Sequence, residues 1–421
     1  MIINEATRDY VRRHADEDVG RLALRGCKDA DVDMTLALNQ IKGRQTARRK
    51  LPSWAAVDGL VYPPHLNMEQ CSSEPTARYK AQLCRRLLAT VEGERWLTDL
   101  TGGFGVDFAF MQEAFSKAVY VERDAQLFAI SSHNFGVLGI SVERFCTDGT
   151  DYLRTMPPAT LIFLDPARRD DHGARTYGIS DCTPDVLSLL PLLLQKGHYV
   201  LLKLSPMLDW RKAVADLGLQ HVSELHIVSV QNECKELLIL LSAEPVGEPL
   251  PTGTLPFALY CANDADVFVL PAGQPAGQPA GQPAAPAQPQ PGGFLFEPNA
   301  SLMKAGCFAE LSERFGVAPI ARDSHLFVSS SAVAAFPGRQ FVVEAVTTMN
   351  KRDLRQALAG ITRANIATRN FPLSVADLRR RLKLADGGDV YLFATTTAAG
   401  EHLLLRCRRL LTQPLARHFL Q

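Results

Sequence analysis

Charged side chains stand at the ends of several apolar runs in this chain, or inside them. Asp99 and Asp165 each follow such a run, and Lys203 lies within the run Tyr199–Leu204. Unbroken apolar runs are typical of strands that are buried on both faces of a parallel sheet. An unpaired buried ammonium is costly, so Lys203 needs a reason for its place, such as an ion pair with Asp165 or Glu236.

A glycine-rich turn comes directly after Asp99. The sequence there reads Asp99-Leu100-Thr101-Gly102-Gly103-Phe104-Gly105-Val106-Asp107. Glycine suits a backbone that turns sharply and approaches a ligand closely, and a helix that begins there offers free N–H groups. The pattern predicts a nucleotide-sized pocket at the end of the first strand, with Asp165 in the same crevice. A glycine-rich turn that binds nothing is the alternative.

Several acids indicate which nucleotide the pocket takes. The dinucleotide fingerprint G-x-G-x-x-G fails at its third glycine, where Phe108 stands. Asp99 precedes the glycines, as in S-adenosylmethionine (SAM) pockets, where an acid meets the positively charged methionine end. Glu122 lies about 20 residues beyond the turn, where a carboxylate accepts both ribose hydroxyl bonds; a strand-end surface glutamate is the alternative. Asp148 either takes the adenine amino group or starts a turn.

We therefore expect SAM as the cofactor and no metal. The candidate cofactor-binding residues are Asp99, Thr101, Gly102, Gly103, Gly105, Glu122, Asp148 and Asp165.

Composition limits the other possibilities. The 421 residues suffice for about three domains. The formal net charge is zero, so a polyanionic partner would need locally segregated charge. Nine scattered cysteines without a C-x-x-C pair indicate the reduced thiols of a cytoplasmic protein and no structural zinc. The sequence shows no signal peptide and no apolar run approaching the roughly 20 residues of a membrane span.

The order of elements predicts four parts. Residues 1–90 form a helical N-terminal domain. Residues 91–245 alternate strand and helix, which implies an α/β domain with a mostly parallel sheet. Residues 246–335 form a small α+β domain, with a helix around Leu302–Phe315 and a disordered Pro/Gln-rich insert at 271–293. Residues 336–421 have a β-α-β-α-β pattern.

The C-terminal part concentrates positive charge. Residues 351–383 hold nine bases against two acids, a formal charge of +7 in a neutral chain. Such segregation suits a phosphate backbone, and solvated helix faces are the alternative. The candidate RNA contacts are Arg352, Arg355, Arg369, Arg379 and Arg380.

Several motifs resemble one known family. They are Gln70-Cys71-Ser72-Ser73-Glu74-Pro75-Thr76-Ala77, the turn 99–107, Asp165-Pro166-Ala167-Arg168-Arg169, Lys203-Leu204-Ser205-Pro206-Met207-Leu208-Asp209, Asn232-Glu233-Cys234-Lys235-Glu236-Leu237-Leu238, Glu297-Pro298-Asn299-Ala300-Ser301 and Ala364-Asn365-Ile366-Ala367-Thr368-Arg369-Asn370. The chain is similar to bacterial class I SAM-dependent methyltransferases with a ferredoxin-like insert and a THUMP-like C-terminal domain. The resemblance implies a Rossmann-like methyltransferase sheet and, because THUMP domains of RNA-modifying enzymes bind RNA, an RNA substrate.

The acceptor side leaves three chemistries open. Base-amine methyltransferases often carry Asp/Asn-Pro-Pro-aromatic after the fourth strand, but here Ala167 and Arg168 fill the last two places. Arginine can still stack on a base. Carbon methylation of pyrimidines usually needs a nucleophilic cysteine, and Ala167 and Ser205 stand at the expected positions.

A third possibility comes from the order of four charged residues. Lys80, Asp165, Lys203 and Glu236 resemble the Lys-Asp-Lys-Glu tetrad of rRNA ribose 2′-O-methyltransferases. A lysine flanked by carboxylates and a second cation can be tuned to deprotonate or orient a ribose hydroxyl. A purely structural ion pair is the alternative.

The sequence thus predicts a SAM-dependent methyltransferase that acts on RNA. A small-molecule or protein methyltransferase and a non-catalytic SAM- or RNA-binding module are the rival hypotheses. The intact residues Asp99, Glu122 and Asp165 argue against the non-catalytic one.

Overall fold

The structure, a computed structural model, describes residues 3–89, 91–168, 178–245, 254–273 and 284–410. These residues divide into two compact units. The first holds residues 3–225 and 235–245, and the second holds the remaining described residues.

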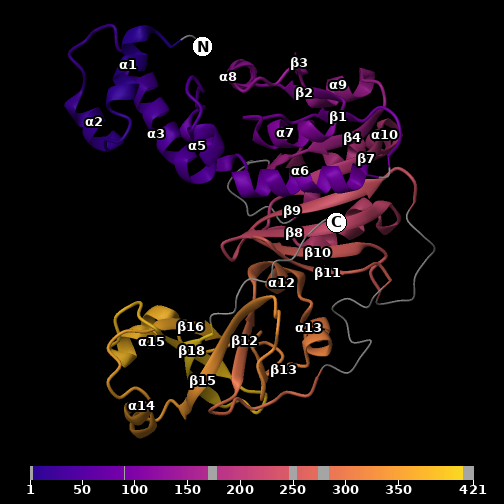
Figure 1. The fold of residues 1–421 in the computed structure, drawn as a ribbon. Coiled ribbons are helices and arrows are strands. Elements are labelled where there is room, and N and C mark those ends of the chain that lie inside the picture. The colour runs from indigo at the N-terminus through magenta and orange to yellow at the C-terminus, as the bar shows by residue number, and fades with distance from the viewer. Residues whose placement is uncertain (1–2, 90, 169–177, 246–253, 274–283, 411–421) are drawn as a thin grey trace. The chain divides into compact units, whose positions relative to one another are not determined.

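Six helices precede the first strand. They are α1 (Glu5–Arg13), α2 (Val19–Arg25), α3 (Met34–Lys50), α4 (Pro52–Ala55), α5 (His65–Gln70) and α6 (Glu74–Leu88). Asn4, Asp18 and Asp33 begin α1, α2 and α3, and each side chain accepts a hydrogen bond from a backbone N–H of the first turn. Tyr10, Leu22 and other apolar residues of these helices form a small core of their own. In Figure 1, α6 lies alongside the sheet that follows.

The sheet that carries the site lies mostly in the first unit, and its residues 226–234 are counted with the second. Its strands are β1 (Trp96–Asp99), β2 (Lys117–Glu122), β3 (Glu143–Cys146), β4 (Ala159–Leu164), β7 (Gly197–Leu204), β8 (Val222–Val230) and β9 (Glu233–Ser242). The strand order is β8-β9-β7-β4-β1-β2-β3. Strands β1, β2, β3, β4 and β7 are parallel to their neighbours in this set, whereas β9 is antiparallel to β7. The carboxyl ends of β1, β2, β4 and β7 therefore meet at one edge.

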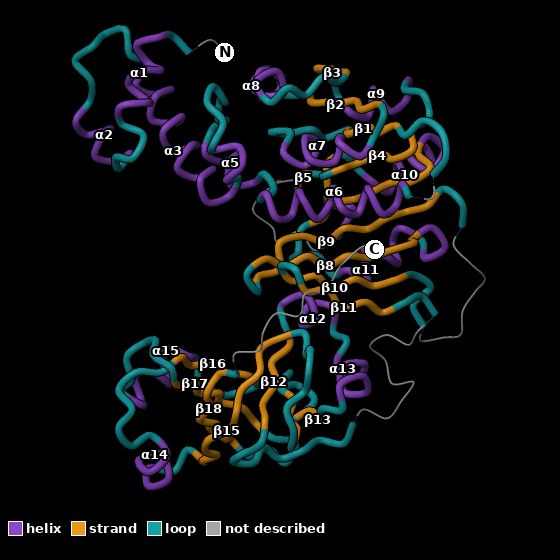
Figure 2. Tube along the Cα trace, viewed as in Figure 1, coloured by secondary structure: helices purple, strands orange, loops and turns teal. Residues whose placement is uncertain are grey.

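Helices connect these strands, as parallel pairing requires. They are α7 (Val106–Met111), α8 (Ala125–Val137), α9 (Gly149–Thr155), α10 (Val186–Lys196) and α11 (Trp210–Leu217), with the short 3-10 turns η1 (Gln112–Ala114), η2 (Ile179–Asp181) and η3 (Leu219–His221). A two-stranded ribbon of β5 (Ala167–Arg168) and β6 (Cys182–Thr183) follows β4. Figure 2 shows these helices and strands by type.

The second unit contains the hairpin β10 (Ala258–Asn263) and β11 (Asp266–Leu270) and a seven-stranded sheet. The strands of that sheet are β12 (Phe294–Pro298), β13 (Ala318–Pro319), β14 (Phe327–Ser329), β15 (Gly338–Thr348), β16 (Asn365–Arg369), β17 (Val390–Thr396) and β18 (His402–Arg409). The helices are α12 (Ala300–Ala305), α13 (Phe308–Phe315), α14 (Lys351–Ala357) and α15 (Val375–Leu382). The strand order is β13-β14-β12-β15-β18-β17-β16.

Alternating side chains of the strands supply two cores on opposite faces of this sheet. Leu392 of β17 packs in one cluster with Leu354 of α14 and Leu378 of α15. The next residue, Phe393, belongs to the other cluster, which includes Leu295 of β12. Helices α14 and α15 therefore cover the same face.

The structure departs from two expectations in the second unit. The helix expected around Leu302–Phe315 is two helices, because Gly306 has a left-handed φ of 75° and ends α12. The insert 271–293 was expected to be disordered, and residues 274–283 lie outside the described part. Residues 284–293, however, are anchored: Ala287 N–H donates to the carbonyl of Pro319 at 3.0 Å and its side chain packs against the core.

The fold class expected from the sequence is confirmed: a mixed α/β sheet, preceded by a helical N-terminal region and followed by small α+β parts. None of the helices in the described ranges combines the length and apolar character that a membrane span needs.

Candidate active site

The turn after β1 is held rigid by its own hydrogen bonds. Asp99, which is 1% exposed, ends β1 at the carboxyl edge of the sheet. Four backbone N–H groups of the turn are engaged inside the protein, in the pairs Thr101 to Asp99, Gly102 to Val121, Gly103 to Glu122 and Gly105 to Gly102. The sequence suggested that the turn offers free N–H groups to a ligand. At these four positions it does not, because each N–H is already bonded inside the protein, and the turn there shapes the pocket wall.

Glycine is required at this turn for two physical reasons. Gly103 and Gly105 have positive φ values of 57° and 79°, which side chains rarely adopt. A Cβ on Gly102 would lie 2.1 Å from a ring carbon of the buried Tyr120. That ring is fixed in turn, because the Tyr120 hydroxyl donates to the carbonyl of Gly103 at 2.5 Å. At these three glycines the turn follows the wall of the pocket with backbone alone.

Glu122 and Asp148 are fixed at the ends of the next two strands. The Glu122 carboxylate accepts two backbone N–H bonds, from Gly103 and from Asp124, both at 2.7 Å. Asp148 caps α9 by accepting from the N–H of Thr150 at 2.8 Å, and it also lines the pocket. Both roles suggested for Asp148, a contact with the adenine amino group and the start of a turn, are therefore compatible with its position.

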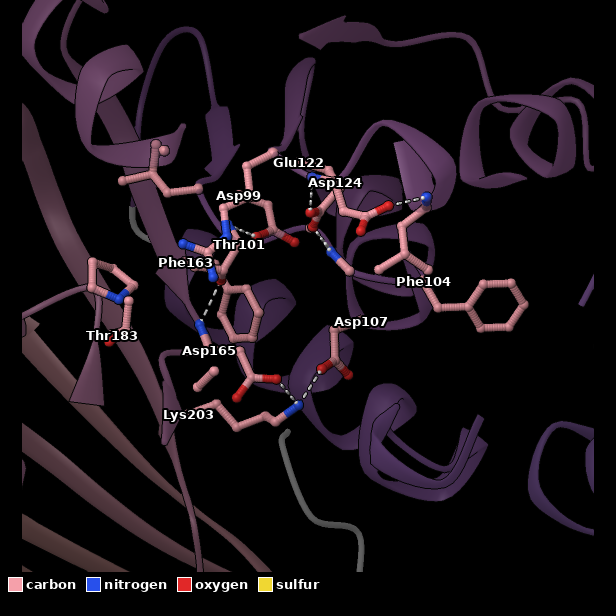
Figure 3. Close-up of a pocket in the computed structure, with 18 of the residues that line it drawn as sticks. Asp99, Thr101, Phe104, Asp107, Glu122, Asp124, Phe163, Asp165, Thr183 and Lys203 are labelled. Atoms are coloured by element: carbon pink, nitrogen blue, oxygen red, sulfur yellow. Dashed lines mark hydrogen bonds and ion pairs between the residues drawn. The ribbon is translucent and has the colours of Figure 1, made fainter. Parts of the chain in front are cut away.

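A cavity of about 590 Å³ opens beside the turn. All eight candidate cofactor-binding residues line it, and so does Lys203. Figure 3 labels Asp99, Thr101, Glu122, Asp165 and Lys203 among the lining residues. Small-molecule sites usually enclose about 300–1,000 Å³, so the cavity has room for a nucleoside-sized cofactor. The glycine wall, the acids at three strand ends and this volume together fit SAM.

Burial changes the proton affinity of Asp99. Desolvation raises the pKa of this carboxyl well above its usual value, while the Thr101 N–H bond opposes the rise and the nearby Asp107 adds to it. An acid in this condition favours a cationic ligand, because the positive charge restores the stability of the carboxylate.

Lys203 projects from β7 into the same cavity, between two carboxylates (Figure 3). Its Nζ lies 2.5 Å from Asp165 and 3.2 Å from Asp107, and it donates to the hydroxyl of Ser72 at 3.2 Å. Burial alone would lower the pKa of Lys203, but Asp165 and Asp107 outweigh it and raise the pKa well above the usual value. Lys203 is therefore an ammonium at neutral pH.

The other two members of the expected tetrad lie behind this pair. Lys80 on α6 is fully buried, and its Nζ lies 2.5 Å from Glu236 and 3.1 Å from Asp107. Neither Lys80 nor Glu236 lines the cavity among the described residues. The structure thus brings the four tetrad residues together, but only Asp165 and Lys203 reach the pocket.

Known proteins resemble this chain over nearly its full length. A candidate methyltransferase from Porphyromonas gingivalis W83 has a crystal structure that superposes with a TM-score of 0.81 at 30% sequence identity, covering 97% of this chain and 100% of that one. Proteins of two Mycobacterium tuberculosis strains, CDC 1551 and H37Rv, are each 25% identical over 351 residues, 79% of this chain and 84% of theirs. Both are named uncharacterized S-adenosylmethionine-dependent methyltransferases.

The chain belongs to this family of SAM-dependent methyltransferases. Two domain models also match the second unit of the methyltransferase: a ferredoxin-like domain at residues 294–337 and a THUMP domain-like region at residues 338–409. The boundary between the two matches falls at the start of β15, so both domains contribute strands to the same seven-stranded sheet.

Two residues of the methyltransferase site had no role assigned from the sequence. Asp107 contacts both lysines, and Ser72 lies between them; both line the cavity. Asp107 belongs to the glycine-turn motif and Ser72 to the motif at residues 70–77. Membership in these motifs was the only feature of the sequence that could have pointed to them.

Among the described residues no group of three or more His, Cys, Asp or Glu side chains has the arrangement of a metal site.

Proposed function

We propose that this methyltransferase transfers the methyl group of SAM to an oxygen of RNA, a ribose 2′-hydroxyl. The observation that carries the proposal is the Asp165–Lys203 pair, which lies in the same cavity as the glycine turn. This position supports the proposal, because the donor and the group that would activate the acceptor would then share one pocket, as methyl transfer requires.

The charge of Lys203 favours an oxygen acceptor. An ammonium beside a hydroxyl stabilises the negative charge that develops as the hydroxyl loses its proton. An amine acceptor gains positive charge during transfer, which the same ammonium would oppose. Because Lys203 already carries its proton, Asp165 is the group that accepts the hydroxyl proton, and its 38% exposure allows it to pass the proton to water.

When bound, SAM would supply an electrophilic methyl group on its sulfonium, and it would leave as S-adenosylhomocysteine once the ribose oxygen has taken that group. Asp99, Glu122 and Asp148 would hold the methionine end, the ribose and the adenine, respectively.

The second unit supports RNA as the substrate. Five basic side chains on or directly after two of its helices are exposed. They are Lys351, Arg352 and Arg355 of α14, Arg381 of α15, and Lys383, which directly follows α15. No ion pair joins these five to an acid among the described residues. Both helices cover one face of the sheet, so the five charges can act on one phosphate backbone.

Three other predicted RNA contacts already have acidic partners. Arg369 donates to the buried Glu297 at 2.7 Å, Arg379 pairs with Asp386 at 2.6 Å, and Arg380 pairs with Asp377. Arg352 and Arg355 are therefore the stronger candidates of the original five.

Purified enzyme, radiolabelled SAM and RNA from a strain that lacks the gene provide the test. Lys203→Met and Asp165→Asn are each expected to lower label transfer by about 10²–10⁴-fold, the usual scale of acid–base and charge-stabilising groups. Both variants should still bind SAM. Label that enters RNA equally well with Lys203→Met, or that enters only protein or small molecules, would contradict the proposal.

A further inference from the structure

A chain of alternating charges leads from the pocket wall into the protein interior. In order, it joins Asp165, Lys203, Asp107, Lys80 and Glu236. Exposure falls along it: the Asp165 side chain is 38% exposed, that of Lys203 12%, and that of Lys80 0%. Asp107 is the link on which the chain depends, because each of its two carboxylate oxygens faces a different lysine.

Ser72 reinforces this link. Its hydroxyl donates to Asp107 Oδ2 at 2.7 Å and accepts from Lys203 at 3.2 Å and from Lys80 at 3.5 Å. Ser72 comes from the loop before α6, Asp107 from α7 and Lys203 from β7. Three separate elements therefore converge on one point in the pocket wall.

We propose that Asp107, together with Ser72, is the positioning residue of Lys203, and that Lys80 and Glu236 hold Asp107 in place without touching the substrate. Lys80 is completely buried and absent from the cavity wall, so it acts through Asp107. The inference rests on the proposed function only in assuming that Lys203 faces the methyl acceptor.

The number of N–H donors on Lys203 indicates which of its contacts a substrate hydroxyl would replace. An ammonium has three N–H donors, and Asp165, Asp107 and Ser72 account for three contacts. Asp107 and Ser72 are buried, whereas Asp165 is the most exposed of the three. An acceptor hydroxyl therefore takes the place of Asp165 at Lys203, which also brings it next to the Asp165 carboxylate that receives its proton.

Electrostatics agrees with this geometry. Burial would raise the pKa of Asp107, but Lys80 and Lys203 outweigh it and lower that pKa to about 2. Asp107 is thus anionic throughout the physiological range, as an anchor for an ammonium must be.

Lysine NMR tests the positioning without any substrate. The full chain is labelled with ¹³C at lysine Cε, and the Lys203 signal is identified by its loss in Lys203→Met. In the unmodified protein this signal is expected to keep its ammonium shift at pH values above the ordinary pKa of a lysine side chain, because Asp165 and Asp107 raise the pKa of Lys203. In Asp107→Asn it should begin to titrate at lower pH, since one of the two carboxylates that raise its pKa is gone.

Three further variants make the test specific. Ser72→Ala removes only a hydrogen bond and should broaden or shift the Lys203 signal even if Asp107→Asn folds poorly. The double variant Lys80→Met/Glu236→Gln removes one charge of each sign and should also shift the signal. Glu224→Gln is the control, because it breaks an ion pair with Arg86 of α6, the helix that carries Lys80, but Glu224 does not line the pocket; it should leave the signal unchanged.

Kinetics supplies the second readout. Asp107→Asn is expected to lower kcat by more than about tenfold and to change the KM for SAM much less. A Lys203 signal and a kcat that Asp107→Asn leaves unchanged would overturn the inference, while RNA methylation could still stand. A shifted Lys203 signal in an enzyme that methylates no RNA would support the positioning and reject the proposed function.

Discussion

Two ionisable side chains of opposite sign share the pocket, and the surroundings affect them differently. Asp99 sits at the end of β1 with its charge disfavoured by burial, whereas the carboxylates beside Lys203 preserve its charge. A cationic ligand would therefore stabilise the ionised form of Asp99, whereas Lys203 is itself a cation. The positively charged methyl donor is thus expected to bind on the Asp99 side of the pocket.

Asp99 should make SAM binding depend on pH. In the ligand-free protein the raised pKa of Asp99 favours the protonated form, and a cationic ligand favours the ionised form. Binding is therefore expected to release protons, and affinity to rise with pH until the free carboxyl is fully ionised. Asp99→Asn should bind SAM about 10–100-fold more weakly, the value of one charge-assisted hydrogen bond, and lose this pH dependence. Calorimetry in buffers of different ionisation enthalpy measures both effects.

The same shift has a consequence for stability. A carboxyl whose folded-state pKa is raised contributes its full stability below the unfolded-state pKa and loses it as pH rises through the folded-state pKa. At neutral pH Asp99 therefore destabilises the ligand-free protein, and Asp99→Asn is expected to have a higher Tm there. An unchanged or lower Tm, together with pH-independent SAM affinity, would show that Asp99 is ionised in the free protein.

The sequence predicted most pocket residues because each stands at a strand end or in the turn. Asp99, Glu122, Asp165 and Lys203 all follow from that rule. Asp107 and Ser72 did not, because their roles depend on how α6 and α7 pack against β7, and residues 35 positions apart become partners only through that packing.

At the level of elements, the pocket depends on the strand–turn–helix unit β1–α7. The turn packs tightly against β2, where Tyr120 contacts both Gly102 and Gly103. The strands were predictable since they are unbroken apolar runs. The break between α12 and α13 was not predictable, because apolar spacing continues across Gly306 while this residue takes the left-handed conformation that ends α12.

Two glycine substitutions test the tightness of this unit. Gly102→Ala places a methyl group 2.1 Å from the Tyr120 ring and is expected to cost about 1–3 kcal/mol or more and to abolish SAM binding. Gly136→Ala is the matched control: it lies in α8, and its Cβ would have no heavy atom within 4 Å. It should stabilise the protein by about 0.5–1 kcal/mol. Chemical denaturation measures both, and equal effects would contradict the assigned packing.

At the level of the whole molecule, the ferredoxin-like and THUMP-like matches share one sheet. Strand β15 of the THUMP-like match pairs with β12 of the ferredoxin-like one, and Arg339 and Arg369 both contact the buried Glu297 across the same boundary. Deleting residues 338–409 would remove four of the seven strands. Charge substitutions in the full chain are therefore the better probe of RNA binding.

Arg352→Ala/Arg355→Ala is expected to weaken RNA binding and to reduce the slope of log affinity against log salt by about 2, one for each lost phosphate contact. Arg12→Ala/Arg13→Ala on α1 removes the same charge from exposed positions of the first unit and serves as the control. Filter binding over a salt series gives the slopes. Equal slopes for the two double variants would mean that α14 makes no phosphate contacts.

Counting charges along the sequence located the basic region, but it did not show how many of its basic side chains are free of acidic partners. The formal +7 of residues 351–383 includes Arg369, Arg379 and Arg380, which pair with acids that lie partly outside that window. The pairs of Arg379 and Arg380 are local, whereas the pair of Arg369 with Glu297 joins segments 72 residues apart. A linear count of formal charge therefore overestimates the free charge.

Nucleoside mass spectrometry of total RNA tests the central claim most directly. RNA is compared among cells that carry the gene, cells that lack it, and cells complemented with Lys203→Met. The account predicts one 2′-O-methylated nucleoside that disappears without the gene and does not return with Lys203→Met. Loss of a base-methylated nucleoside instead, or an RNA profile that does not change at all, would contradict it.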